Sequence, residues 1–222
     1  MTTFILASAS PARLKVLRAA GLEPVVRVSD VDEDAVAAAL PGGTTPDGVV
    51  VALAQAKART VAGELSAGLD GVCWLDGADA FDSVVVGCDS MLHIAGELQG
   101  KPLSVEVARQ RWATMAGRSG DLLTGHSVLR LRDGKVVAAA SGCTTTTVHF
   151  ASPSDTDLDA YLASGEPLQV AGAFTLDGLG GWFVEKIDGD PSSVIGIGLP
   201  LLRRLLSEVG VSISDLWDRS GS

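Results

Sequence analysis

The sequence has few cysteines and few histidines for its 222 residues. They are Cys73, Cys88, Cys143, His93, His126 and His149. The cysteines are odd in number and form no CxxC pair, and the histidines lack the short spacing of metal ligands. The pattern therefore indicates neither a disulfide framework nor a zinc site, and we expect structural roles for all six residues.

Basic residues are also scarce. The chain has 17 Lys and Arg against 27 Asp and Glu, which gives a formal net charge of −10. A protein this acidic is a poor non-specific binder of nucleic acids or of anionic membranes, so we expect neither as a partner. It can still bind a small polyanion where a few cations converge.

Long apolar runs are missing, since none approaches the roughly 18 residues of a membrane-spanning helix. The N-terminus has no basic region followed by an apolar one, which is the pattern of a secretory signal. We therefore expect a cytoplasmic protein. The length suits one large domain or two small lobes around a shared core, and we predict a single domain over residues 1–222 with a surface insertion at residues 66–83.

The most informative segment is the start of the chain. The apolar run Phe4–Ala7 predicts a buried strand, and a short helix is predicted to follow, with Ser10 as its N-cap. The free backbone N–H groups at such a helix start attract anions, and Arg13 adds a charge that matches phosphate geometry. The segment is either an ordinary capped helix or an anion site.

Strands and helices alternate along most of the chain. Asp133-Gly134 joins two strand patterns and is typical of an antiparallel hairpin, so we predict an α/β fold with a mixed sheet. We expect strands at residues 4–7, 25–28, 84–89, 124–132, 135–150 and 182–187. We expect helices at residues 49–65, 105–115, 154–162 and 200–209, and an acidic loop at residues 29–34.

Asp89 comes directly after the apolar strand pattern Val84–Cys88. An acid at the carboxyl end of a buried strand often faces a ligand crevice, where it can orient a water molecule or hold a metal ion. The alternative is a cap or turn residue. Lys101, after a turn at Gly100, can neutralise a phosphate or lie as a solvated surface charge. Lys57 lies in an alanine-rich helix, where the ordinary role of a lysine is a solvent-facing charge.

These segments resemble the Maf family of nucleotide pyrophosphatases over nearly the whole chain. Ser8, Ser10, Pro11 and Arg13 match the family's Ser-x-Ser-Pro-Arg-Arg signature, with Ala12 in place of the first arginine. Gly87–Ser90 resembles the family's Gly-Ala-Asp-Thr segment, although Cys88 and Ser90 depart from it. Further matches are Lys57-Ala58, Lys101-Pro102, Ser164–Pro167 and Ala171–Phe174. The resemblance implies two α/β lobes about a central cleft.

The resemblance also implies roles for residues. It implies that Asp89 is the catalytic base, that Glu33 lies near the active site, and that Lys57 and Lys101 contact phosphate. Glu33 and Asp89 could hold Mg²⁺ or Mn²⁺ together, because Mg²⁺ in proteins takes one or two carboxylates plus substrate phosphates. Ala12, Ser90 and Asp177 depart from the family pattern at positions linked to substrate choice, which argues against a strict dTTP/UTP preference.

The function predicted from the sequence is hydrolysis of nucleoside triphosphates to nucleoside monophosphates and pyrophosphate. Arg13, Lys57 and Lys101 would bind phosphates, with Ser8 and Ser10 beside them. Two alternatives stay open: a nucleotidyltransferase, and a nucleotide-sensing regulator of cell division without turnover. The sequence does not decide between a monomer and a homodimer.

Overall fold

The computed structural model describes residues 2–68 and 82–217, and in them the chain is an α/β protein. Seven strands form one mixed sheet in the order β2-β1-β3-β5-β6-β7, and β4 pairs with β3 off this path. The strands are β1 (Thr3–Ala7), β2 (Val25–Val26), β3 (Asp82–Ile94), β4 (Glu97–Gln99), β5 (Ser119–Arg132), β6 (Lys135–Phe150) and β7 (Val184–Asp188). The predicted fold class is confirmed.

The described residues also form seven α-helices and four short 3₁₀ helices. The α-helices are α1 (Pro11–Ala19), α2 (Glu33–Ala38), α3 (Pro46–Gly68), α4 (Val105–Met115), α5 (Asp155–Ala163), α6 (Pro191–Ile195) and α7 (Leu199–Glu208). The 3₁₀ helices are η1 (Glu166–Gln169), η2 (Ala171–Ala173), η3 (Leu179–Phe183) and η4 (Ile213–Asp215). Of these described helices, none has the length and hydropathy needed to cross a membrane.

The strand pairing explains the apolar run at the start of the chain. β1 lies between two parallel neighbours, so that Ile5 pairs with Val25 of β2 and with Val85 of β3. A strand with neighbours on both sides in an α/β sheet is covered by other chain segments on both faces, and Phe4–Ala7 are all buried. The hairpin at Asp133-Gly134 is also as predicted, because both residues have positive φ, which the tightest hairpin turns require.

The chain divides into two compact units. The first comprises residues 1–89, 125–143 and 199–222, and the second comprises residues 90–124 and 144–198. The predicted cleft between two lobes stays a prediction.

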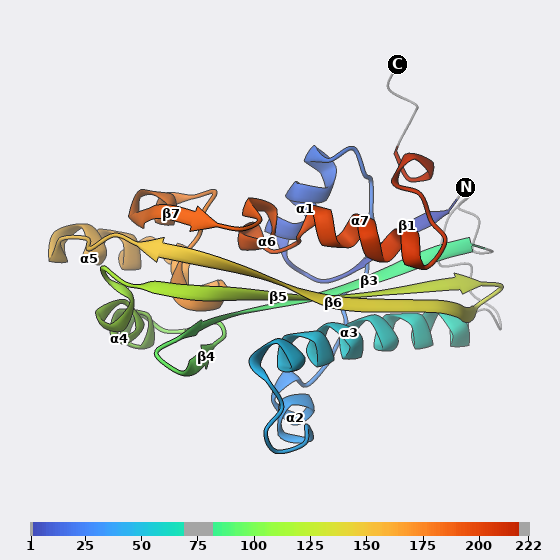
Figure 1. Cartoon of the computed structure of the whole chain (residues 1–222), viewed down its shortest axis with the longest axis horizontal. Helices are drawn as coiled ribbons and strands as arrows, with labels where there is room; N and C mark the ends of the chain where they lie inside the picture. The colour runs from blue at the N-terminus through green and yellow to red at the C-terminus, as the bar shows by residue number, and fades with distance from the viewer. Residues whose placement is uncertain (1, 69–81, 218–222) are drawn as a thin grey trace. The chain divides into compact units, whose positions relative to one another are not determined.

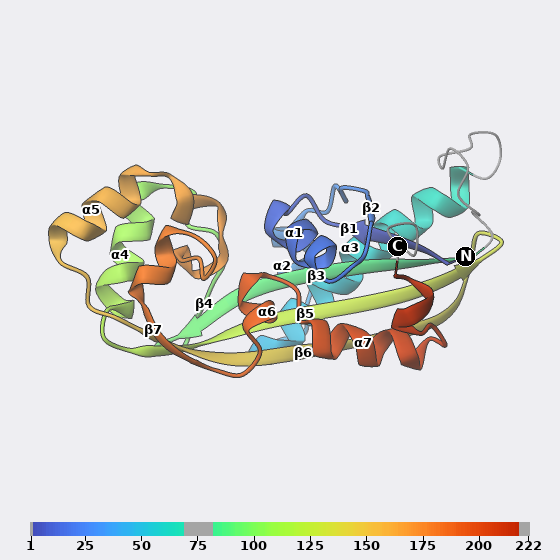
Figure 2. The same ribbon diagram turned by 90° about the horizontal axis from the view of Figure 1, so that it is seen from above.

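In the first unit, α3 covers one face of the strands, and α1 and α7 cover the other (Figures 1 and 2). The backbone of α3 touches the sheet directly, because the sheet has glycine where the helix crosses it. A Cβ atom at Gly87 would lie 2.2 Å from the carbonyl oxygen of Ala54, and one at Gly125 would lie 2.3 Å from that of Val50. These two glycines therefore set the distance between α3 and the sheet, and so determine how close the side chains of α3 come to β3.

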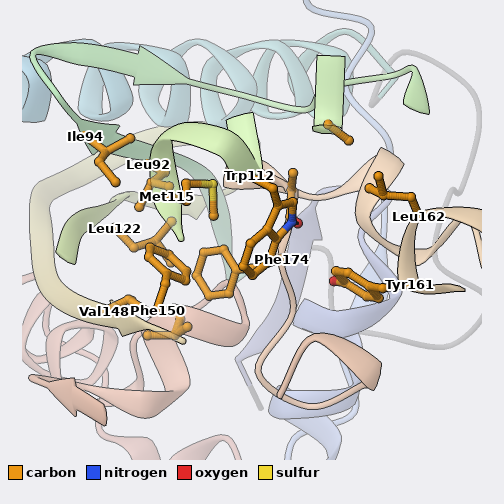
Figure 3. Close-up of a cluster of buried hydrophobic side chains, with 13 residues drawn as sticks. Leu92, Ile94, Trp112, Met115, Leu122, Val148, Phe150, Tyr161, Leu162 and Phe174 are labelled. Atoms are coloured by element: carbon orange, nitrogen blue, oxygen red, sulfur yellow. The ribbon is translucent and has the colours of Figure 1, made fainter. Parts of the chain in front are cut away.

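The second unit has its own aromatic core around Trp112 of α4 (Figure 3). The indole makes edge-to-face contacts with Phe150, Tyr161 and Phe183, at ring-centroid distances of 5.8, 6.2 and 5.8 Å. Its Nε1–H donates to the carbonyl of Ala173 at 2.9 Å, so the buried polar group of this side chain is satisfied. The indole therefore fixes η2 and η3 against α4 and α5.

Several predicted boundaries differ from the structure. The strand predicted at 25–28 is only Val25–Val26, and the strand predicted at 84–89 runs from Asp82 to Ile94. The acidic loop at 29–34 ends early, because Asp32 caps α2 by accepting a hydrogen bond from the Ala35 N–H at 2.9 Å, and helix formers follow. β5 begins at Ser119 rather than at residue 124. The strand predicted at 182–187 starts only at Val184, because η3 takes up the preceding residues.

The helix predicted at 49–65 is longer in both directions, since α3 runs from Pro46 to Gly68. Proline at the first helical position explains the earlier start. Most of the insertion predicted at 66–83 lies outside the described residues, which end at 68 and resume at 82.

Candidate active site

The segment after β1 folds as a capped helix start, as the sequence predicts. Ser10 is the N-cap of α1, and its Oγ accepts from the Arg13 N–H at 3.4 Å, with Pro11 at the first helical position. Ser8 is buried, and its Oγ accepts from the Ser10 N–H at 3.2 Å and from Nη1 of Arg13 at 2.9 Å. These two bonds use the acceptor positions of the Ser8 hydroxyl, so its hydrogen is what it can offer to an anion. The segment thus holds Arg13 in a defined place beside the N-terminus of α1.

A second cluster forms where α3 crosses β3. The ammonium of Lys57, from α3, lies 2.6 Å from Oδ1 of Asp89 at the end of the first unit's part of β3. It also lies 2.8 Å from Oε1 of Glu33, the first residue of α2. Lys57 and Asp89 are both buried, whereas Glu33 is about half exposed. One ammonium therefore joins two carboxylates, and the three ionised groups together carry one negative charge.

The environment of Asp89 favours proton uptake. Burial has the largest effect and raises the pKa of Asp89 above its ordinary value, although Lys57 and Arg13 act in the opposite direction. Oδ2 of Asp89 is buried and has no hydrogen-bond partner among the described residues. A carboxylate with a raised pKa and one oxygen without a hydrogen-bond partner is suited to accept a proton from a water molecule.

The neighbouring thiol is not a competing nucleophile. Burial raises the pKa of Cys88 to about 11, so the group is a neutral thiol near pH 7. The thiolate is the reactive and metal-binding form of cysteine, and Cys88 thus serves to fill the core.

The donor set at this cluster fits a hard divalent cation that is shared with a phosphorylated ligand. Within residues 2–68 and 82–217, no group of three or more His, Cys, Asp or Glu side chains could hold a metal ion. Glu33 and Asp89 supply two carboxylates, and Oδ2 of Asp89 is an uncompensated buried oxygen. Mg²⁺ is commonly held by one or two carboxylates, with water and substrate phosphates completing its shell.

Sequence comparison gives the family of the chain. The family model described as "Maf-like protein" matches residues 3–209. The chain belongs to the Maf-like protein family. Membership confirms the resemblance read from Ser8–Arg13 and from Gly87–Ser90.

Several relatives of this Maf-like protein carry the name "Nucleoside triphosphate pyrophosphatase". The relative from Nocardia farcinica (strain IFM 10152) is 68% identical over 216 residues, covering 97% of both chains. The relative from Rhodococcus opacus (strain B4) is 64% identical and covers 100% of this chain and 99% of its own. One from Mycobacterium marinum (strain ATCC BAA-535 / M) is 56% identical over 217 residues.

The structure brings together most of the residues predicted from the sequence. Ser8, Ser10 and Arg13 meet after β1, and Glu33, Lys57 and Asp89 meet where α3 crosses β3. Burial raises the pKa of Asp89, and the charge of Arg13 opposes that rise, so the two groups of residues are electrostatically linked. Lys101 lies in the second unit and is exposed, so its place in the site stays a prediction.

The ion pairs of Lys57 are the part of the site that the sequence analysis missed. Lys57 was weighed as a phosphate contact or a solvated charge, yet its side chain is buried between two carboxylates. The spacing within the helix could have indicated this burial. Leu53, Lys57 and Val61 follow the i, i+4 spacing of one helix face, and Leu53 and Val61 are fully buried. A lysine on such a face needs a buried anionic partner.

Proposed function

We propose that this chain hydrolyses nucleoside triphosphates to nucleoside monophosphates and pyrophosphate. The observation that carries the proposal is the buried Asp89 carboxylate, which is paired with Lys57 at Oδ1 and has no hydrogen-bond partner at Oδ2 among the described residues. The names of its close relatives support the same reaction.

In this mechanism, Asp89 acts as the general base. Oδ2 takes a proton from a water molecule as the water oxygen bonds to the α-phosphorus. The bond from the α-phosphorus to the bridging oxygen breaks, and that oxygen leaves with pyrophosphate. Lys57 keeps Oδ1 occupied, so that Asp89 presents one oxygen in a fixed direction. A general base of this kind contributes about 10²–10⁴-fold to the rate.

The residues after β1 bind the phosphates. Arg13 supplies a guanidinium, Ser8 supplies a hydroxyl donor, and Ser10 shapes the N-terminus of the nine-residue helix α1. Lys101 adds a further cation from the second unit. Positioning and charge neutralisation then supply much of the remaining rate enhancement.

Glu33 and Asp89 are the residues that would hold a divalent cation, Mg²⁺ or Mn²⁺. Such an ion, when bound, neutralises phosphate charge and helps to align the triphosphate. We therefore expect activity to need an added divalent ion after exhaustive chelation, and full activity of the chelated protein would contradict this.

The base preference is expected to be broad, without a strict preference for dTTP and UTP. Asp177 has a carboxylate where one family subgroup has a glutamine amide, and a carboxylate cannot donate a hydrogen bond to a base carbonyl. Comparison of kcat/KM for UTP, dTTP, CTP, GTP and ATP tests this. A preference for UTP and dTTP above about a hundredfold, roughly 2.7 kcal/mol, would contradict it.

One assay separates the proposed reaction from its alternatives. The purified chain is incubated with a nucleoside triphosphate and a divalent ion, and the products are identified with and without acceptor molecules. Monophosphate and pyrophosphate from water alone support hydrolysis, whereas a requirement for an acceptor indicates a nucleotidyltransferase. Binding without any product indicates a sensor. The charge of −10 is the reason that we expect no nucleic-acid binding. A cytoplasmic location belongs to the same proposal, which leaves homodimerisation open.

A further inference from the structure

Three polar side chains of the second unit form a continuous hydrogen-bonded chain across three neighbouring strands. Ser119 begins β5, His149 lies near the end of β6, and Asp188 ends β7. The Oγ atom of Ser119 lies 2.7 Å from Nδ1 of His149, and Nε2 of His149 lies 2.8 Å from Oδ2 of Asp188. All three residues belong to the same compact unit, and the proposed mechanism uses none of them.

The charge of Asp188 fixes the direction of these hydrogen bonds. The ammonium of Lys186 lies 2.7 Å from Oδ1 of Asp188. Hydrogen bonds from Lys186 and then from His149 lower the pKa of Asp188, so this carboxylate is ionised near neutral pH. An ionised carboxylate can only accept, so Nε2 of a neutral His149 ring carries the hydrogen. Nδ1 is then an acceptor, and the hydroxyl of Ser119 donates to it.

The aromatic core of the second unit holds the end of β6 in place. Phe150, which follows His149, is buried in that core (Figure 3). Its ring lies 5.8 Å from that of Trp112 and 4.9 Å from that of Phe174, centroid to centroid, with edge-to-face geometry in both contacts. The backbone that carries His149 is therefore part of a well-packed element, as a catalytic group requires.

The pairing of β6 with β7 is irregular at the same point. His149 pairs with Lys186, whereas Phe150 pairs with Val184, which leaves Glu185 as an extra residue in β7. A bulge of this kind changes the direction in which the following side chains point, and bulges are common beside active sites. It lies directly before the segment of β7 that brings Asp188 to the imidazole.

The three side chains are accessible to solvent. Ser119 is exposed, and the side chains of His149 and Asp188 are 35% and 50% exposed. A small molecule can therefore reach the hydroxyl of Ser119, where water would solvate the oxyanion of a tetrahedral intermediate. Such a site suits an ester with a good leaving group, because that reaction depends least on a preorganised oxyanion hole.

We propose that Ser119, His149 and Asp188 form a second, nucleophilic site that hydrolyses small activated carboxylic esters. A serine hydroxyl that donates to a histidine, which a carboxylate in turn orients, is the arrangement of a nucleophile with its general base. This inference does not rest on the proposed pyrophosphatase activity.

The reaction at this site has two steps. In the first, Oγ of Ser119 bonds to the ester carbonyl carbon and its proton moves to Nδ1 of His149. The bond from that carbon to the alcohol oxygen breaks, and the alcohol leaves with the proton from Nδ1. In the second step, a water oxygen bonds to the carbonyl carbon of the acyl-serine and gives its proton to Nδ1. The acid leaves, and the proton returns to Oγ of Ser119.

Hydrolysis of p-nitrophenyl acetate tests the proposal. Ser119→Ala and His149→Gln should each lower kcat/KM for this ester by about tenfold or more, because they remove the nucleophile and its base. Asp188→Asn should cause a smaller loss, since an amide can donate to Nε2 and so favour the tautomer with its hydrogen on Nδ1.

Two control variants remove the same chemical groups elsewhere. His93→Gln removes another part-exposed imidazole, and Ser214→Ala removes a hydroxyl that pairs with that of Ser212. Both should hydrolyse the ester at the wild-type rate. Thermal unfolding of each variant shows whether it is folded.

Labelling of the wild-type protein tests the nucleophile without any substitution. A fluorophosphonate leaves a stable phosphonyl group on a reactive serine and releases fluoride. Mass spectrometry should locate this group on Ser119, and His149→Gln should abolish the labelling. An unlabelled Ser119 would overturn the proposal.

The kinetics distinguish this site from simpler explanations. If Ser119→Ala keeps the wild-type rate while His149→Gln loses it, the imidazole acts alone and the proposal is wrong. Wild-type rates in all three site variants would also overturn it, because the three side chains would then serve only as a polar ladder on the sheet.

Discussion

The ammonium of Lys57 lies 2.6 Å from one carboxylate oxygen of Asp89, while the other oxygen of that carboxylate has no hydrogen-bond partner among the described residues. The pair is built from α3 and β3, which touch backbone to backbone at Gly87.

The first outcome is a pH profile. A general base works in its ionised form, so activity falls as the pH drops through the pKa of Asp89 in the folded protein. Burial raises that pKa, so kcat/KM should be lost at a higher pH than for an ordinary aspartate. Lys57→Gln removes the ammonium that opposes this shift and should move the acidic limb higher still. A limb that stays in place in Lys57→Gln would contradict the coupling of the two groups.

The second outcome concerns stability. Lys57→Met keeps the length of the side chain but leaves the buried carboxylate of Asp89 without its ammonium. Removing one partner of a buried ion pair lowers the free energy of unfolding by about 3–5 kcal/mol. Lys186→Met breaks the exposed pair with Asp188 and should lower it by no more than about 1 kcal/mol. Denaturant unfolding of the two variants at neutral pH measures the difference, and equal losses would show that the Lys57 pair is not buried as described.

The third outcome concerns phosphate binding. Arg13→Ala and Lys101→Ala each remove a cation that is expected to contact the triphosphate. A hydrogen bond to a charged group contributes about 1.5–3 kcal/mol, so kcat/KM should fall about tenfold or more in each. Thermal unfolding should change little for Lys101→Ala, because its side chain is exposed. Wild-type kinetics in both variants would show that neither Arg13 nor Lys101 contacts the triphosphate.

The fourth outcome concerns the contact between α3 and the sheet. Gly87→Ala places a Cβ atom against the backbone of α3, where neither partner is a flexible side chain. Overpacking of this kind lowers the free energy of unfolding by about 1–3 kcal/mol. Gly63→Ala, on the same helix, meets no atom within 4 Å and replaces glycine by a better helix former. Denaturant unfolding should therefore show a loss for the first variant and a small gain for the second; a gain for both would mean that the close contact is absent.

Local sequence patterns predicted the local structure well. The strand, N-cap and helix of Phe4–Ala19 form as expected, and so does the tight turn at Asp133-Gly134, because neighbouring residues decide these features. The start of α2 at Glu33 was missed, although Asp32 and the helix formers after it carried a helix signal.

The site was predictable as a set of residues but not as a set of contacts. Lys57 and Asp89 are 32 positions apart, and their ion pair depends on how closely α3 packs on β3. Gly87 and Gly125 permit this close packing, but the sequence does not indicate which helix packs against them. The family resemblance identified the candidate site residues, and the tertiary structure shows which of them contact one another.

The rate of pyrophosphate release by Asp89→Asn tests the central claim most directly. The asparagine keeps the shape of the side chain and removes the base, so release from ATP should fall by about 10²–10⁴-fold while thermal unfolding shows a folded protein. Asp159→Asn, which alters an exposed acid of α5, should release pyrophosphate at the wild-type rate. Near-normal release by folded Asp89→Asn would contradict the assignment of Asp89 as the catalytic base.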